Sequence, residues 1–204
     1  MPTRVVLDNG ITVIAKTNRT SPSVSIVVGA RTGGYTDPAG REGVAALCAR
    51  VLDRGTVSRP ADVIADDLDG RGASLNVSTG RHLMSVGATC LVDDFAPVLA
   101  LVGDVVQHPA FVDAEVATRR ADLISSIKQN EDQPASRAVD AFVAALYGSH
   151  PYARKIRGTV ESVDTLKRQD LVRCHQKGFV PAGLTVVVVG DVDEQAVVDA
   201  IAQT

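Results

Sequence analysis

Cysteine and histidine are the side chains best suited to bind a metal or to supply a nucleophile and a base. The three cysteines are too widely spaced to form a metal-ligand motif, and no two histidines stand three or four residues apart. These residues are Cys48, Cys90, Cys174, His82, His108, His150 and His175. We expect the cysteines to be buried free thiols. The sequence indicates no zinc site built from close pairs, and leaves open only an arrangement of distant histidines on one surface.

The segment from Gly43 to Thr56 has the pattern of an amphipathic helix over residues 42–54. Its apolar side chains recur at helical spacing. They are Val44, Leu47, Cys48, Val51 and Leu52. Taken alone, this pattern predicts a helix that packs one face into a core, and it indicates no chemistry.

The same segment resembles the metal-binding helix of a peptidase family. In active members of the pitrilysin or insulinase family, which includes the mitochondrial processing peptidase subunits and the bc1 core subunits, it reads G-x-A-H-x-x-E-H-x-x-x-x-G-T. Gly43, Ala45, Gly55 and Thr56 match this motif. The match covers its glycines, one alanine and its threonine, and none of the residues that carry the chemistry.

The resemblance implies that the catalytic residues are lost. The two ligand histidines fall on Ala46 and Arg50, and the catalytic glutamate falls on Ala49. A third ligand, a glutamate of a later helix, falls on Ser126, and a second acidic position of that helix falls on Arg119. Catalytic zinc needs three protein ligands and a group that takes the proton from its water. We therefore expect a non-catalytic homologue that holds no metal and no other cofactor.

The role of Arg50 itself is open. Its permanent positive charge stands where the resemblance places a ligand of a divalent cation. We favour a structural filler, with pairing to Asp53 or Glu131 and exposure to solvent as the alternatives. An active peptidase with an unrecognised site is a further alternative, but its candidate nucleophiles, Ser125, Ser126 and Cys48, have no histidine near them in sequence.

The resemblance continues along the chain in a constant order. Asn9-Gly10 between two apolar runs is a strong hairpin signal. Further matches are 72–79 (GASLNVST), 150–153 (HPYA), 158–159 (GT), 179–182 (FVPA) and 190–191 (GD). Each match is weak alone, whereas their shared order over residues 3–204 identifies the family.

Periodicity predicts strands followed by helices and a returning strand. Strands are expected over 5–14 as a hairpin and over 23–29, 75–77, 83–90 and 184–189. Helices are expected over 42–54, 60–70 with Ser58 as N-cap, 93–107, 113–130, 135–147, 163–177 and 194–202. This order predicts an α+β two-layer sandwich. The resemblance implies the processing-peptidase type of metallohydrolase fold, a mostly antiparallel sheet with helices on one face.

Composition excludes several classes of protein. The chain has 204 residues, 45% of them hydrophobic, and a net charge of −3 from 21 basic and 24 acidic residues. The charges are interspersed, so no nucleic-acid partner is indicated. No apolar run reaches the roughly 20 residues that cross a bilayer, and none near Met1 has the form of an export signal. The compartment, cytoplasm or periplasm, is left open.

The resemblance also implies partners. Family subunits usually carry two similar halves, so we expect residues 1–204 to form one domain, the N-terminal half of a longer subunit or a short member that pairs with another chain. Our hypothesis is a pseudo-peptidase that helps a zinc-bearing homologous subunit or half to enclose peptides, with a scaffold like the bc1 core proteins as the alternative. Asn76 and Val77 match a strand that pairs with the substrate backbone in active members, although an ordinary edge strand would look the same.

Overall fold

A six-stranded sheet forms the centre of the computed structural model, which describes residues 1–204. Its strands are β1 (Thr3–Val6), β2 (Thr12–Thr17), β3 (Ser23–Ala30), β4 (Ser74–Thr79), β5 (Met84–Leu91) and β6 (Leu184–Gly190). Their order is β1-β2-β6-β3-β5-β4, and β2 and β6 form the one parallel pair. The last strand of the chain therefore lies between two early ones, and β4 lies at an edge.

β-Branched residues and alternating burial explain the central strands. In β6, Val186 is buried while Val187 and Val189 point to the opposite face. Val186 lies opposite Val28 of β3, which in turn lies opposite Val86 of β5. Such rows of valine on one face are the cross-strand pairs that stabilise a sheet.

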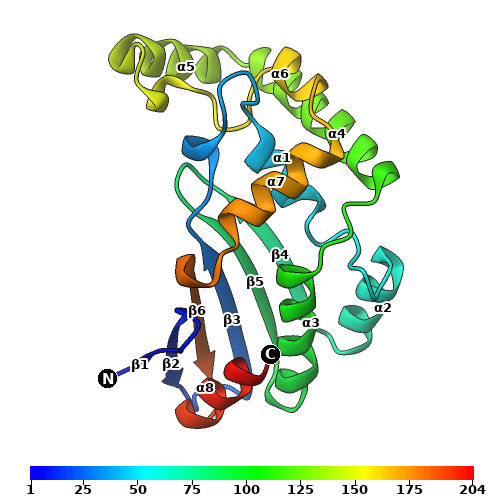
Figure 1. The fold of residues 1–204 in the computed structure, drawn as a ribbon, viewed down its shortest axis with the longest axis vertical. Coiled ribbons are helices and arrows are strands. Elements are labelled where there is room, and N and C mark those ends of the chain that lie inside the picture. Colours follow the sequence, from blue (N-terminus) through cyan, green and yellow to red (C-terminus); the bar gives the residue numbers. More distant parts are fainter.

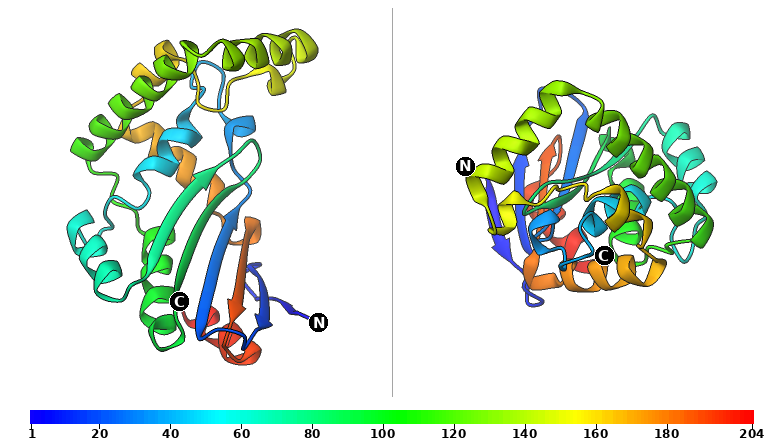
Figure 2. Two further views of the ribbon diagram at one scale, coloured as in Figure 1. Left: turned by 180° about the vertical axis from the view of Figure 1, so that it is seen from behind. Right: turned by 90° about the horizontal axis from the view of Figure 1, so that it is seen from above.

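The helices cover that face and leave the other open. They are α1 (Val44–Val51), α2 (Ala61–Gly70), α3 (Phe95–Gln107), α4 (Asp113–Glu131), α5 (Pro134–Tyr147), α6 (Val160–Asp164), α7 (Arg168–Gly178) and α8 (Glu194–Gln203). α1 packs against β4, α3 against β5 and α8 against β2, and α4 and α7 lie against α1 (Figures 1 and 2). The expected α+β sandwich is confirmed.

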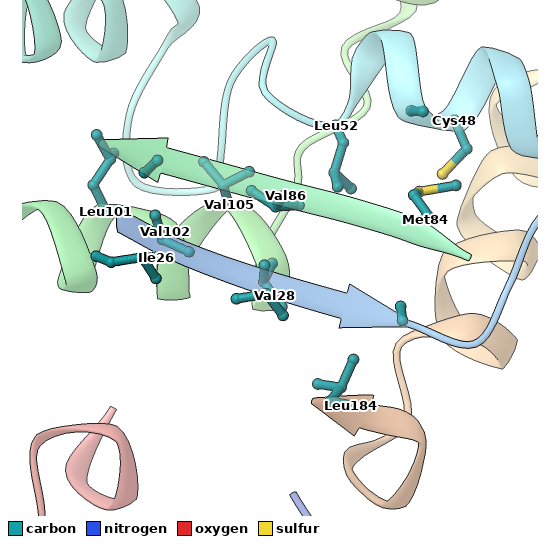
Figure 3. Close-up of a cluster of buried hydrophobic side chains, with 14 of the residues drawn as sticks. Ile26, Val28, Cys48, Leu52, Met84, Val86, Leu101, Val102, Val105 and Leu184 are labelled. Atoms are coloured by element: carbon teal, nitrogen blue, oxygen red, sulfur yellow. The ribbon is translucent and has the colours of Figure 1, made fainter. Parts of the chain in front are cut away.

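The core lies between the sheet and the helices α1 and α3. Leu52 and Leu101 are fully buried there and meet Ile26 of β3 and Met84 of β5 in one cluster (Figure 3). Each buried side chain of this size stabilises the fold by about 1.5–3 kcal/mol relative to exposure. α1 is therefore held as a core helix by its apolar face.

The uncovered face of the sheet carries hydroxyl groups and valines rather than charges. Among its side chains are Ile14, Ser25, Val27, Asn76, Ser78, Ser85, Thr89, Val187 and Val189. Arg4 and Lys16 are the only charged side chains that the strands place on this face. Figure 2 shows this face without a covering helix.

Two sequence-based expectations about helices are wrong. The single helix expected over 163–177 is two helices, because α6 ends at Asp164 and α7 begins at Arg168, where the Asp170 carboxylate accepts the Lys167 N–H at 2.9 Å. Ser58 does not cap α2, since Pro60 holds the N-cap position and the Ser58 hydroxyl donates elsewhere.

Helix α5 extends away from the body at one end of the molecule (Figure 1). None of its residues is buried, and Val139, Phe142 and Leu146 are exposed. The Lys155 ammonium ties α5 to α4, since its Nζ lies 3.1 Å from Glu131 Oε1 and 3.3 Å from Asp140 Oδ2.

Candidate functional site

A buried carboxylate fixes the start of α1. Asp37 Oδ2 accepts the Gly43 N–H at 2.7 Å, and Oδ1 accepts the Ala45 N–H at 3.1 Å. Gly43 has φ 93°, and a Cβ at this residue would lie 2.6 Å from the Arg157 carbonyl oxygen. Only glycine fits this conformation and this approach. The first glycine of the motif is thus explained by backbone geometry.

The same carboxyl has an unusual acidity. Asp37 is 4% exposed, and this burial raises its pKa from 3.8 to about 6. The two backbone hydrogen bonds and the Arg154 guanidinium act in the opposite direction, because they favour the ionised form. Asp37 therefore changes charge near pH 6 at the N-terminus of α1.

The motif positions on α1 carry no group that binds a metal. Ala46 and Ala49 are each 5% exposed, and their methyl groups belong to the core cluster. Arg50 is half-buried, and its side chain forms no hydrogen bond or ion pair. α1 therefore presents two methyl groups and a free guanidinium at these positions.

The carboxylates considered as partners of Arg50 are occupied by other cations. Asp53 Oδ1 lies 3.3 Å from Arg54 Nε, and Glu131 pairs with Lys155. Pairing of Arg50 with either of them is therefore wrong, and the reading of Arg50 as a filler or solvated side chain stays a prediction.

The two positions on α4 also carry no ligand. Ser126 Oγ accepts a hydrogen bond from Arg157 Nη1 at 3.3 Å. Arg119 pairs within its own helix, with Glu115 at 3.5 Å and Asp122 at 3.0 Å. Nowhere in the chain do three His, Cys, Asp or Glu side chains lie close enough to share a metal ion. Sequence reasoning missed Arg157, because it reaches α4 from a loop distant in sequence.

The last two residues of the motif are structural. Gly55 has φ 112°, which favours glycine, and the buried Thr56 donates its hydroxyl to Asp104 Oδ2 at 2.7 Å. Ser58 and Arg59 donate to the same oxygen at 2.7 and 2.8 Å. Burial acts to raise the pKa of Asp104, but these hydrogen bonds outweigh it and the pKa is lowered. The motif has kept the residues that hold the turn after α1.

Strand β4 presents an unpaired backbone edge. Asn76 lies opposite Gly87, and Val77 opposite Val86. The Gly80 N–H donates to Leu83 O at 2.8 Å, and hydrogen-bonded pairs alternate along an antiparallel ladder. Asn76 and Ser78 are therefore bonded to β5, whereas the N–H and C=O groups of Leu75, Val77 and Thr79 point away from the sheet.

The two residues expected to bind peptide thus have different roles in the strand. The Asn76 side chain is exposed on the open face of the sheet. The Val77 side chain is partly buried against the core, and its backbone faces outward. The structure brings this edge beside α1, because β4 and α1 are in contact.

An aromatic cluster lies at the tip of the β4–β5 hairpin. His82 Nε2 is 2.7 Å from the Tyr152 hydroxyl, and Tyr35 packs against both rings with centroids 5.1 and 5.7 Å away. His150 accepts the Tyr152 N–H through Nδ1 at 3.2 Å. The cluster contains all three tyrosines of the chain, Tyr147 being the third.

The candidate nucleophiles lack a base. The three cysteines are free, Cys48 and Cys90 being buried and Cys174 half-buried. A hydrogen bond with Cys174, together with burial, raises the pKa of Cys48. No histidine forms a hydrogen bond with Cys48, Ser125 or Ser126. This geometry gives no support to hydrolysis by these residues.

No helix has the length and apolar character needed to cross a membrane.

A model of the insulinase family, peptidase family M16, matches residues 12–160. An uncharacterized zinc protease of Mycobacterium leprae is 30% identical over 195 residues, 96% of this chain and 44% of that protein. One of Mycobacterium tuberculosis is 29% identical over 197 residues, 97% of this chain and 45% of that protein. The chain thus spans about half the length of the curated relatives it matches.

Solved structures with the same fold include an inactive domain, a periplasmic protease and pitrilysin. The peptidase M16 inactive domain from Pseudomonas fluorescens superposes with a TM-score of 0.94 at 22% identity, over all of this chain and 50% of that one. The periplasmic protease PqqL from Escherichia coli superposes with a TM-score of 0.90 at 18% identity, over 99% of this chain and 23% of that one. Pitrilysin superposes with a TM-score of 0.88 at 18% identity, over 100% of this chain and 22% of that one. At this identity the likeness concerns the fold.

Proposed function

Since the chain belongs to the insulinase family of peptidases, peptidase family M16, we propose that it is a non-catalytic member that binds peptide beside a zinc-bearing homologue. One observation carries this proposal. The residues that shape α1 and its turn are kept, whereas Ala46, Ala49, Arg50 and Ser126 stand at the positions of the ligands and the catalytic carboxylate.

The chemistry of these replacements supports loss of the reaction. A catalytic zinc takes three nitrogen, sulfur or carboxylate ligands and keeps one position for water. Methyl groups donate no electron pair, and Arg50 and Arg157 bring fixed positive charges to α1 and to Ser126. Such charges oppose the entry of a divalent cation.

The unpaired edge of β4 supports peptide binding. An extended peptide gains affinity from main-chain hydrogen bonds when it adds to an exposed strand edge, and this needs no metal. Leu75, Val77 and Thr79 offer three outward N–H groups and three outward carbonyl groups in register. Hydrolysis would then belong to the partner, a homologous subunit or a second half that carries zinc.

The greater length of the relatives is the reason to propose a partner. Proteins called zinc proteases match this chain over less than half of their own length. We propose that residues 1–204 form one half of a larger assembly and that its open sheet face is covered there. A scaffold role without peptide binding is the alternative that the experiments below separate.

The first test measures zinc in the chain after equilibrium dialysis, together with peptide hydrolysis. We expect neither zinc nor turnover. The matched control is a variant with the ligand set restored by Ala46→His, Ala49→Glu, Arg50→His and Ser126→Glu, which should take up about one zinc per chain. Stoichiometric zinc in the unaltered chain, with cleavage sensitive to chelators, would overturn the proposal.

The second test compares Val77→Pro with Val77→Ala in peptide binding by the assembled complex. Both variants lose the valine side chain, but only proline removes the outward N–H. We expect Val77→Ala to keep most of the affinity and Val77→Pro to lose at least tenfold. Equal binding by the two variants would exclude strand addition at β4, and no binding by the unaltered complex would favour the scaffold.

A further inference from the structure

A cavity of about 320 Å³ opens where the edge strand β4 ends. It lies between α4, α5 and the loop over 153–158, and the residue that follows the strand by two positions, Arg81, forms part of its wall. Arg154 and Arg157 line the same cavity, and we call it the arginine cavity. Ile127, Val143 and Ile156 give it an apolar lining.

None of its three guanidinium groups forms an ion pair, although Arg154 lies near enough to the Asp37 carboxylate to lower its pKa. Arg81 Nη1 donates to the Arg154 carbonyl oxygen at 3.4 Å, Arg154 Nη1 to the Asp37 carbonyl oxygen at 3.1 Å, and Arg157 Nη1 to Ser126 Oγ at 3.3 Å. Each bond has a neutral acceptor and uses one of the five N–H groups that a guanidinium carries. The remaining donors of three arginines are free for a ligand.

The carboxylates of the cavity do not neutralise these charges. Glu131 and Asp140 both lie against Lys155, at 3.1 and 3.3 Å. With Lys155 counted, four cationic side chains line the cavity against two carboxylates, which leaves an excess of two positive charges. Guanidinium groups bind carboxylates in bidentate geometry, and such bonds are stronger where water is partly displaced by apolar walls.

The cavity lies in line with the proposed peptide edge. The backbone of Thr79 faces outward, and Arg81 follows it at the hairpin tip, with its guanidinium 5.4 Å from the centre of the Tyr152 ring. A strand advances about 3.3 Å per residue, so a peptide paired with Val77 and Thr79 would reach Arg81 within two or three residues.

We propose that the arginine cavity binds a carboxylate of the peptide that adds to β4, so that the protein selects acidic peptides. The inference rests on the proposed peptide binding. The carboxylate comes from a glutamate or aspartate side chain or from the C-terminus of the peptide, since both present the same two oxygens. Specificity of this kind needs no catalytic group in this chain.

Three unlabelled, N-acetylated ten-residue peptides of Thr, Val and Ser test the proposal by isothermal titration calorimetry with the full chain. One carries Glu near an amidated C-terminus, one Gln in its place, and one Gln with a free C-terminal carboxylate. We expect the Glu peptide, the free-carboxylate peptide or both to bind at least tenfold more tightly than the neutral peptide, which also identifies the source. Equal affinity of all three would overturn the inference and leave peptide binding intact.

Variants locate the effect. Two variants, the single Arg81→Gln and the double Arg154→Gln/Arg157→Gln, should bind the acidic peptides no more tightly than the neutral one. Arg4→Gln makes the same charge change on the opposite edge strand and should keep the preference for acidic peptides. Arg81→Gln loses one long hydrogen bond and the contact with the Tyr152 ring, and breaks no ion pair, so it serves if the double variant unfolds. If Arg81→Gln and the double variant both still bind acidic peptides more tightly than the neutral one, the carboxylate does not bind in the arginine cavity. Absence of binding by all three peptides, to the chain and to its assembled complex, would overturn both the proposed function and this inference.

Discussion

At the scale of single residues, the motif on α1 keeps the side chains that the fold needs and has alanines and an arginine at its other positions. Gly43 and Gly55 hold backbone conformations, and Thr56 bonds Asp104, so their retention follows from packing. Ala46 and Ala49 fill the core with the smallest side chains that a helix favours. These replacements can be read from the sequence alone, because the motif is a continuous segment. The sequence could not predict Arg157, whose contact with α4 depends on the path of a loop.

Asp37 should make stability depend on pH in an unusual direction. Its pKa is raised in the folded chain, so the folded state holds the extra proton between about pH 4 and pH 6, and its contribution is lost as pH rises through 6. We expect the free energy of unfolding, relative to Asp37→Asn, to fall by up to about 3 kcal/mol from pH 4 to pH 7. Urea titrations measure it, with exposed Asp66→Asn as control. A constant difference would refute the raised pKa.

Asp104 should act in the opposite direction. Its pKa is lowered, so its contribution is complete above the unfolded value and is lost as pH falls through the folded value. Asp104→Ala leaves three donors without their acceptor, and we expect a loss of about 2 kcal/mol at pH 7 by chemical denaturation. Asp66→Ala, an exposed carboxylate without a bond, is the control. Similar stability of the two variants would contradict this role.

At the scale of elements, the sequence predicted the Asn-Gly hairpin, the valine strand β6 and most helices, because each has a strong local period. It failed where a tertiary contact decides the ends of a helix. Asp170 starts a new helix within the apolar period that predicted one over 163–177, and Asp104 takes the Ser58 hydroxyl expected to cap α2. The position of β4 at an edge was implied by the family resemblance and not by any local pattern, since strand order is set by long-range pairing.

Proline substitutions should distinguish the two sides of β4. Asn76→Pro removes an N–H that bonds β5, and we expect a loss of about 3 kcal/mol or more. Val77→Pro removes an N–H that faces outward, so its loss should exceed that of Val77→Ala by less than about 1 kcal/mol. Thermal and urea unfolding of the three variants measures these differences. Equal destabilisation by the two prolines would mean that the register of the ladder is shifted.

At the scale of the whole molecule, one face of the sheet has a covering layer and the other has none. The open face is poor in charge and carries the exposed Val27 and Val189 among its hydroxyl groups. The sequence indicated such a face through the family resemblance. The partner that covers it is part of our proposal.

A charge placed on this face should weaken assembly without unfolding the chain. Val27 lies on central strand β3 and is 37% exposed, so Val27→Lys should change the free energy of unfolding by less than about 1.5 kcal/mol. We expect it to weaken association with the zinc-bearing homologue at least tenfold, by light scattering. Ala117→Lys, on the outer surface of α4, is the matched control. Unchanged association of Val27→Lys would show that the partner binds elsewhere.

The position of β6 has a consequence for the newly made protein. β2 and β3 are not paired with each other, and both hydrogen-bond to β6. A ribosome must therefore deliver residues 184–190 before the N-terminal hairpin can join the rest of the sheet. Until then the nascent chain exposes two strand edges, which are sites for chaperone binding and for mispairing. Messages that end before this strand should yield a product that is cleared rather than folded.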